Sequence, residues 1–169
     1  MSDIHANLER YLDAEAILNT FFVSFDFCRQ CIAAEMEANG HQPTAACCKN
    51  KYYALYDLDH PAFDLLRAER QKRYGSPEDH CRENPVSPCE YHDPARGCLL
   101  TTYKSPICLS FLCREAIDAL RTIHGIYAYD YLGVHYALEL ILTGGFTADQ
   151  YRQFRDSLLE MVRKVEGNY

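Results

Sequence analysis

Cysteines are the residues of this chain whose type and spacing could do chemistry. The 169-residue sequence holds nine of them, and eight follow an ordered pattern: Cys28, Cys31, Cys47, Cys48, Cys89, Cys98, Cys108 and Cys113. Zinc and iron–sulfur clusters both take thiolate ligands in tetrahedral arrangements, so four converging cysteines could complete a zinc site or hold one cluster. A closed shell of four sulfurs leaves no open position for a substrate, which favours a structural or electron-transfer role. The spacing does not distinguish zinc from iron.

The start of the chain bears on whether these thiols stay reduced. It is acidic, with Asp3, Glu9 and Asp13, and it lacks the basic start and apolar core of a signal peptide. No stretch of the sequence is long and apolar enough to cross a bilayer, so we expect a cytoplasmic protein without a membrane partner. In a reducing compartment, clustered cysteines favour metal ligation over disulfides. Inert burial as small apolar side chains is the third interpretation.

Other residues compete weakly for a role at the metal. His92 follows Cys89 at a C-x2-H spacing that zinc could use, and His80 directly precedes Cys81. Exposed loop positions account for such histidines more often than metal ligation does. Cys81 lies outside the ordered pattern, and we interpret it as a residue that does not bind metal.

Charge and motif content exclude several classes of function. The net charge of -7 argues against nucleic acid as a partner, because nucleic-acid affinity depends on clustered lysine and arginine. The sequence lacks dinucleotide and phosphate loops, zincin motifs and hydrolase elbows, so no catalytic residue is predicted. One basic run is expected to form the solvated end of a helix, namely Arg67, Arg70, Lys72 and Arg73.

Helical periodicity dominates the chain, and no alternating run is convincing enough to predict a sheet. We expect a single domain over residues 1–169, an all-α helical bundle with an irregular cysteine-rich metal-binding region (27–113) followed by C-terminal helices (114–166). The predicted helices run from Ile4 to about Phe22, Ile32 to Ala38, just after Asp59 to Tyr74, Arg114 to Ile123, Tyr129 to Leu142, and just after Thr147 to Gly167.

Local signals place individual residues on these helices. Asp59 is the expected N-cap ahead of a proline, and Thr147 with Gln150 forms a capping box. Glu15, like the other acidic residues of the first helix, is expected to lie off the apolar face. Two histidines are expected in the core or at helix ends, namely His124 and His135. The helix that starts near Tyr129 is expected to pack through a side that includes Leu132, Tyr136 and Leu140.

The patterned cysteines fall on different local structures. Cys28 and Cys31 are expected at or inside a helical segment, where residues three apart share a face. Adjacent residues on a helix point in different directions, so Cys47 and Cys48 could serve one site only from a turn. Residues 81–113 contain prolines and a glycine that exclude a continuous helix. We therefore expect an irregular loop there, held together by the metal.

The second half of the pattern, CEYHDPARGCLLTTYKSPICLSFLC, resembles the YkgJ-type family of zinc- or iron-chelating domains. The features that carry the resemblance are Cys89, the Gly-Cys step at Cys98 and the Pro-x-Cys segment at Cys108. The resemblance extends from Phe27 to Cys113. One departure is that residues 32–46 separate the C-x2-C pair from the CC pair, which are nearly contiguous in typical members. The resemblance implies that all eight patterned cysteines hold zinc or an iron–sulfur cluster.

Flagellin lysine methylases are similar in the same cysteine motif. That similarity implies a second interpretation, an iron–sulfur-dependent enzyme that modifies a protein side chain, although no S-adenosylmethionine site is recognisable in this sequence. A third interpretation is an interaction module, which binds another protein through its helical surface while a zinc ion only supports the structure.

Overall fold

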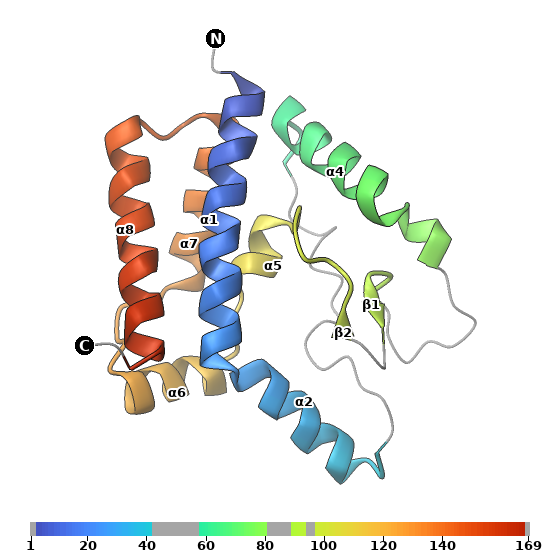
Figure 1. Cartoon of the computed structure of the whole chain (residues 1–169), viewed down its shortest axis with the longest axis vertical. Coiled ribbons are helices and arrows are strands. Elements are labelled where there is room, and N and C mark those ends of the chain that lie inside the picture. The colour runs from blue at the N-terminus through green and yellow to red at the C-terminus, as the bar shows by residue number, and fades with distance from the viewer. Residues whose placement is uncertain (1–2, 42–57, 81–88, 94–96, 168–169) are drawn as a thin grey trace.

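The computed structural model describes residues 3–41, 58–80, 89–93 and 97–167. Its elements confirm the predicted all-α class (Figure 1). The helices are α1 (Ile4–Phe25), α2 (Phe27–Ala38), α4 (Pro61–Tyr74), α5 (Pro106–Ser110), α6 (Arg114–His124), α7 (Tyr131–Thr143) and α8 (Ala148–Val165), with a 3-10 turn, η2 (Pro77–His80). Two strands of two residues each, β1 (His92–Asp93) and β2 (Gly97–Cys98), pair antiparallel with His92 opposite Cys98.

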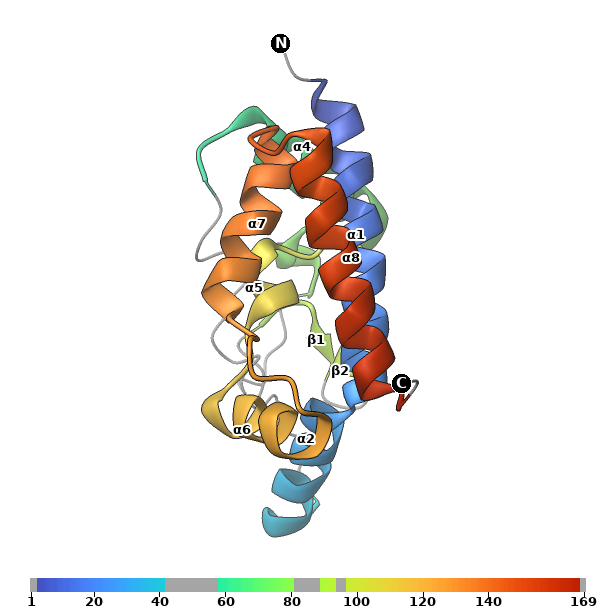
Figure 2. The same cartoon turned by 90° about the vertical axis from the view of Figure 1, so that its left-hand side faces the viewer.

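The main core lies between α1, α7 and α8, which run side by side in both views (Figures 1 and 2). Periodic apolar residues bring one face of each helix into this core, and these side chains are almost completely buried. Helix α5 packs against α7, and α4 packs against α1. The fully buried side chains of the core include Tyr11, Leu18 and Phe21 of α1, Leu138 and Leu142 of α7, and Leu158 of α8.

The start of α8 confirms the predicted capping box. Gln150 N donates to Thr147 Oγ1 at 3.2 Å, and Thr147 N donates to Gln150 Oε1 at 2.9 Å. These two bonds satisfy backbone donors that the first turn of a helix would otherwise leave unpaired.

A polar cluster on the surface ties α8 to α1. Tyr151 Oη donates to Asp13 Oδ2 at 2.5 Å, and Arg155 Nε lies 2.9 Å from the same oxygen. The hydrogen bond from Tyr151, together with the neighbouring Arg155, holds the pKa of Asp13 below its ordinary value. A carboxylate with a lowered pKa stabilises the folded state above its unfolded pKa, and this stabilisation is lost as the pH falls through the folded pKa.

Replacing Tyr151 with phenylalanine is expected to lower the free energy of unfolding by about 0.5–1 kcal/mol at neutral pH, because the pair is partly exposed. The deficit should shrink as the pH falls below the lowered pKa of folded Asp13, where Asp13 is protonated in both proteins. Urea unfolding at the two pH values measures this, with Tyr136→Phe as the control, because Tyr136 is 58% exposed. Equal deficits at both pH values would contradict the role of Asp13.

Two expectations about helix faces and caps are wrong. His60, not Asp59, is the N-cap of α4, because its Nδ1 accepts a hydrogen bond from Ala62 N at 3.1 Å and the proline at position 61 begins the helix. The side of α7 that was expected to pack against the bundle faces outward instead. This helix is apolar on most of its sides, so sequence spacing alone could not identify the side that meets α1. The exposed fractions are 46% for Leu132, 58% for Tyr136 and 44% for Leu140.

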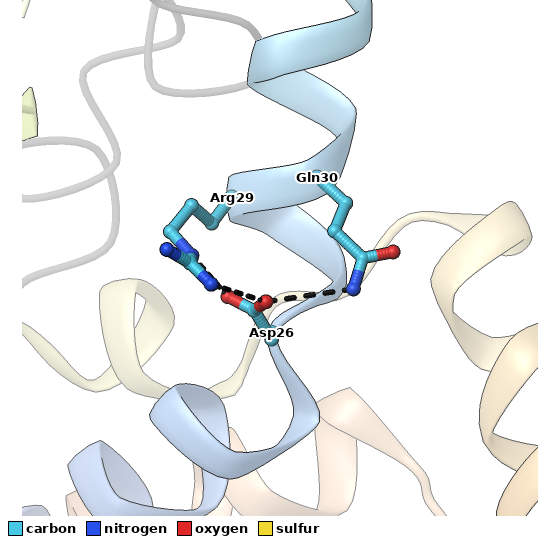
Figure 3. Close-up of polar contacts among 3 residues, drawn as sticks. All are labelled: Asp26, Arg29 and Gln30. Atoms are coloured by element: carbon cyan, nitrogen blue, oxygen red, sulfur yellow. Dashed lines mark hydrogen bonds and ion pairs between the residues drawn. The ribbon is translucent and has the colours of Figure 1, made fainter.

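A sharp turn at Asp26 separates α1 from α2 and directs α2 away from the bundle (Figure 1). Asp26 has a left-handed backbone, with φ of 54°, a conformation that aspartate tolerates better than most residues. Its carboxylate accepts two hydrogen bonds from Arg29, at 2.5 and 2.7 Å, and one from Gln30 at 3.4 Å (Figure 3). The turn therefore fixes the start of α2, which comes before the predicted start at Ile32.

None of the helices in the described part of the chain has the length and apolar character needed to span a membrane.

Candidate metal centre

Six of the eight patterned cysteines lie in the described part of the chain, while Cys47 and Cys48 lie outside it. On α2 are Cys28 and Cys31, which confirms the expectation that this pair is helical. The remaining four are distributed over the segment that follows η2: Cys89 before β1, Cys98 in β2, Cys108 in α5 and Cys113 at the N-cap of α6.

Three of these cysteines border one small apolar cluster that is distinct from the main core. Tyr91 and Leu100 are its buried centre, and Cys89 and Cys108 pack against them. Cys98 reaches the same cluster through its thiol, whose Sγ lies 3.7 Å from the carbonyl oxygen of Leu100. Segments that are separated in the sequence therefore bring three thiols to one place.

The pKa of Cys108 reflects its burial and its charged neighbours. Desolvation, with a smaller contribution from the negative charges of Cys98 and Cys89, raises the pKa of the Cys108 thiol to about 12. Ser105, which is fully buried, opposes part of the rise because its Oγ lies 3.2 Å from Cys108 Sγ. A pKa this high means that Cys108 is a neutral thiol at ordinary pH when no cation replaces its proton.

The loop between Cys98 and Cys108 is held by α1. Glu15 is only 1% exposed, and its carboxylate accepts hydrogen bonds from Thr102 Oγ1 at 2.8 Å, Tyr103 N at 2.9 Å and Lys104 N at 2.8 Å. Burial raises the pKa of Glu15, while the three hydrogen bonds and the Lys104 charge oppose the rise. Tyr11 Oη adds a bond to the Lys104 carbonyl oxygen at 2.6 Å. The loop therefore has a fixed position against the bundle.

Helix α4 holds the same loop from the other side. Tyr74 Oη accepts from Thr101 N at 3.1 Å and from Thr102 N at 3.0 Å. One turn earlier, Arg70 Nε donates to the carbonyl oxygen of Tyr103 at 2.6 Å. Tyr74 also packs against the apolar cluster that Cys89 and Cys108 border. Two helices thus position Cys98 and Cys108 by fixing the backbone between them.

The other three described cysteines lie near the end of the bundle where α2 and α6 meet. Burial raises the pKa of Tyr129 strongly, and the charge of Cys28 raises it further, so this thiol lies near the tyrosine. The Tyr129 hydroxyl donates to the carbonyl oxygen of Ser110 at 2.5 Å, three residues before Cys113. Cys113 itself packs against the main core. The thiols of the described cysteines thus lie in two neighbourhoods, one around Cys108 and one near the α2–α6 junction.

Neither neighbourhood is a finished metal site. Within residues 3–41, 58–80, 89–93 and 97–167, no group of three or more His, Cys, Asp or Glu side chains has an arrangement that could hold a metal ion. No disulfide joins any two of the six described cysteines. The donor set is nevertheless the one that zinc and iron–sulfur clusters use, because three thiols converge without a competing disulfide between them.

The histidines take mainly structural positions. His92 is 3% exposed and lies opposite Cys98 in the strand pair, so it is not the exposed loop residue expected. His80 Nε2 lies 2.6 Å from the Tyr74 carbonyl oxygen. The expectations for the two C-terminal histidines are confirmed. His124 ends α6, and buried His135 lies 2.9 Å from Glu139.

Sequence reasoning missed Glu15 and Arg70, the two buried charged residues that hold the loop. Arg70 is 2% exposed, so the expectation of a fully solvated basic run is wrong at this position. A signal for Glu15 was present, because it lies four residues after Tyr11 and three before Leu18 and therefore shares their buried face. A similar signal was present for Arg70, because it lies seven residues after Phe63 and four after Leu66, both buried, and therefore shares their face of α4.

Comparison with known proteins gave no match: no family model, curated protein or solved structure corresponds to this chain. The resemblance to the YkgJ-type family therefore stays a prediction.

Proposed function

We propose that this protein binds zinc or an iron–sulfur cluster through cysteine thiolates, with Cys89, Cys98 and Cys108 at the centre. The observation that carries the proposal is the convergence of these three thiols on one apolar cluster, from three separate segments. A disulfide would join only two of these thiols, whereas a metal centre can bind all three. A fourth ligand comes from the remaining patterned cysteines, Cys28, Cys31, Cys47, Cys48 and Cys113.

The small size of the apolar cluster supports a structural need for the metal. Among the residues that the structure describes, only Tyr91 and Leu100 are buried at its centre, and this cluster is separate from the main core. A metal that joins Cys89, Cys98 and Cys108 would therefore add to the stability of this region. Metal binding displaces the protons of the thiols. Without a metal, the high pKa of Cys108 means that this thiol keeps its proton.

A closed shell of four thiolates suits a structural or electron-transfer role. Glu15 and Tyr74 preorganise the loop before metal arrives, so the chain does not have to order that backbone at the moment of binding. The three thiols must still move closer, since they are not in ligating contact in the described structure.

Titration of the reduced, metal-stripped protein with Co²⁺ tests the proposal. Thiolate ligands give Co²⁺ an intense charge-transfer absorption, and tetrahedral coordination gives it strong visible bands. We expect both signals, with a sharp equivalence point and their loss when zinc is added. A titration that shows no charge-transfer absorption, together with no brown colour after reconstitution with iron and sulfide, would overturn the proposal.

A further inference from the structure

Arg70 is a buried cation next to the proposed metal centre. Its side chain is 2% exposed, and its Nε donates to the Tyr103 carbonyl oxygen at 2.6 Å, in the loop that leads to Cys108. Tyr103 has a left-handed backbone, with φ of 57°, a conformation that few non-glycine residues adopt. Burying an arginine costs free energy unless negative charge or hydrogen bonds compensate it.

Arg70 shares a face of α4 with a residue of the apolar cluster that the thiols border. Residue 74 lies one helical turn later, and its ring packs in the cluster bordered by Cys89 and Cys108. The proximity is also electrostatic. Desolvation dominates the raised pKa of Cys108, and the guanidinium of Arg70 offsets part of it.

A nearby cation would stabilise a metal–thiolate centre. Zinc bound to four thiolates carries a net charge of about -2, and a four-iron cluster in its usual oxidised state with four thiolates carries about the same. Negative charge away from water is costly, and nearby cations and hydrogen bonds reduce that cost. The lysine of the same loop, Lys104, directs its Nζ to Asn19 Oδ1 at 2.6 Å, which leaves Arg70 as the buried cation of the cluster among the described residues.

We propose that Arg70 balances the charge of the metal–thiolate centre, so that its buried guanidinium favours an anionic, all-thiolate ligand set over a neutral one that includes histidine. This inference rests on the proposed function and names a positioning residue for it. Arg70 acts through its charge on Cys108 and does not itself bind the metal. The hydrogen bond to Tyr103 holds the guanidinium in place.

The test compares Co²⁺ affinities of the metal-stripped wild type, Arg70→Gln, Arg70→Lys and Arg67→Gln, by competition with a chelator. Arg70→Gln keeps a hydrogen-bond donor but loses the charge, and its affinity should fall by about 10–100-fold. Arg70→Lys keeps the charge and should retain most of the affinity. Arg67→Gln is the matched control on the same helix, because Arg67 pairs with Asp64 at the surface, and it should bind as the wild type does.

The outcomes separate charge from structure. Wild-type affinity in Arg70→Gln would overturn the inference and leave the proposed function intact, whereas a wild type that binds no Co²⁺ would overturn both. An equal loss in Arg70→Lys and Arg70→Gln would show that hydrogen-bond geometry matters and charge does not. If Arg70→Gln fails to fold by circular dichroism, Arg70→Lys decides alone, and a loss of tenfold or more, by the same outer-shell scale, overturns the inference.

Discussion

Replacing Cys108 with serine is expected to lower metal affinity by more than about a hundredfold, since even changes outside the ligand shell cost about 10–100-fold. Cys108 packs against the same apolar cluster as Cys89, and the negative charges of Cys89 and Cys98 both raise its pKa. A serine hydroxyl does not ionise at ordinary pH and is a poor ligand for zinc or iron. Zinc content after dialysis and Co²⁺ titration both measure the loss.

Cys81→Ser is the matched control for Cys108→Ser, because Cys81 lies outside the ordered pattern of cysteines. It should bind metal as the wild type does. Both variants are compared by circular dichroism so that a folding defect is not mistaken for the loss of a ligand. Equal metal content in the two variants would show that Cys108 is not a ligand, and that the thiols around it gather for another reason.

Replacing Glu15 with alanine is expected to lower the free energy of unfolding by about 2–4 kcal/mol. The substitution removes the acceptor of three hydrogen bonds, from Thr102 Oγ1, Tyr103 N and Lys104 N, at a site that is 1% exposed. Backbone donors left without an acceptor away from water carry a desolvation penalty, whatever the protonation state of the original carboxyl group. Urea unfolding followed by circular dichroism measures the change.

The same substitution should weaken metal binding, because the released loop leads directly to Cys108. Glu9→Ala is the control, since Glu9 is an exposed acidic residue of the same helix, and its effect on stability should stay within about 0.5 kcal/mol. A Glu15→Ala protein as stable as Glu9→Ala would show that the three hydrogen bonds add nothing to the fold. Normal metal affinity in a destabilised Glu15→Ala protein would instead show that the hydrogen bonds of Glu15 do not contribute to metal binding.

Features set by neighbouring residues could be predicted from the sequence. The capping box at Thr147 and Gln150 depends on residues three apart, and the structure has both of its hydrogen bonds. The order and approximate bounds of the long helices follow from apolar periodicity in the same way. The turn at Asp26 was missed although its partners, Arg29 and Gln30, are also local, because no sequence signal requires a left-handed aspartate there.

Features set by contacts distant in sequence could not be predicted. Helical periodicity places Glu15 and Arg70 on buried faces, but it does not identify the loop residues 102–104 to which they hydrogen-bond. The side of α7 that faces α1 depends on where the two helices cross. Because α7 is apolar on most sides, its sequence is compatible with packing through several of them. The packing of the loop, and not the spacing of the cysteines, likewise determines which thiols meet Cys108.

The most direct measurement is the metal and sulfide content of the protein purified without oxygen, with its visible absorption spectrum. We predict either zinc in a colourless protein or iron with acid-labile sulfide in a brown one, at no less than about one site per chain. Iron with sulfide would assign an electron-transfer or redox role, and zinc would assign a structural one. A well-folded, reduced protein that contains neither metal would contradict the central claim that the cysteines form a metal centre.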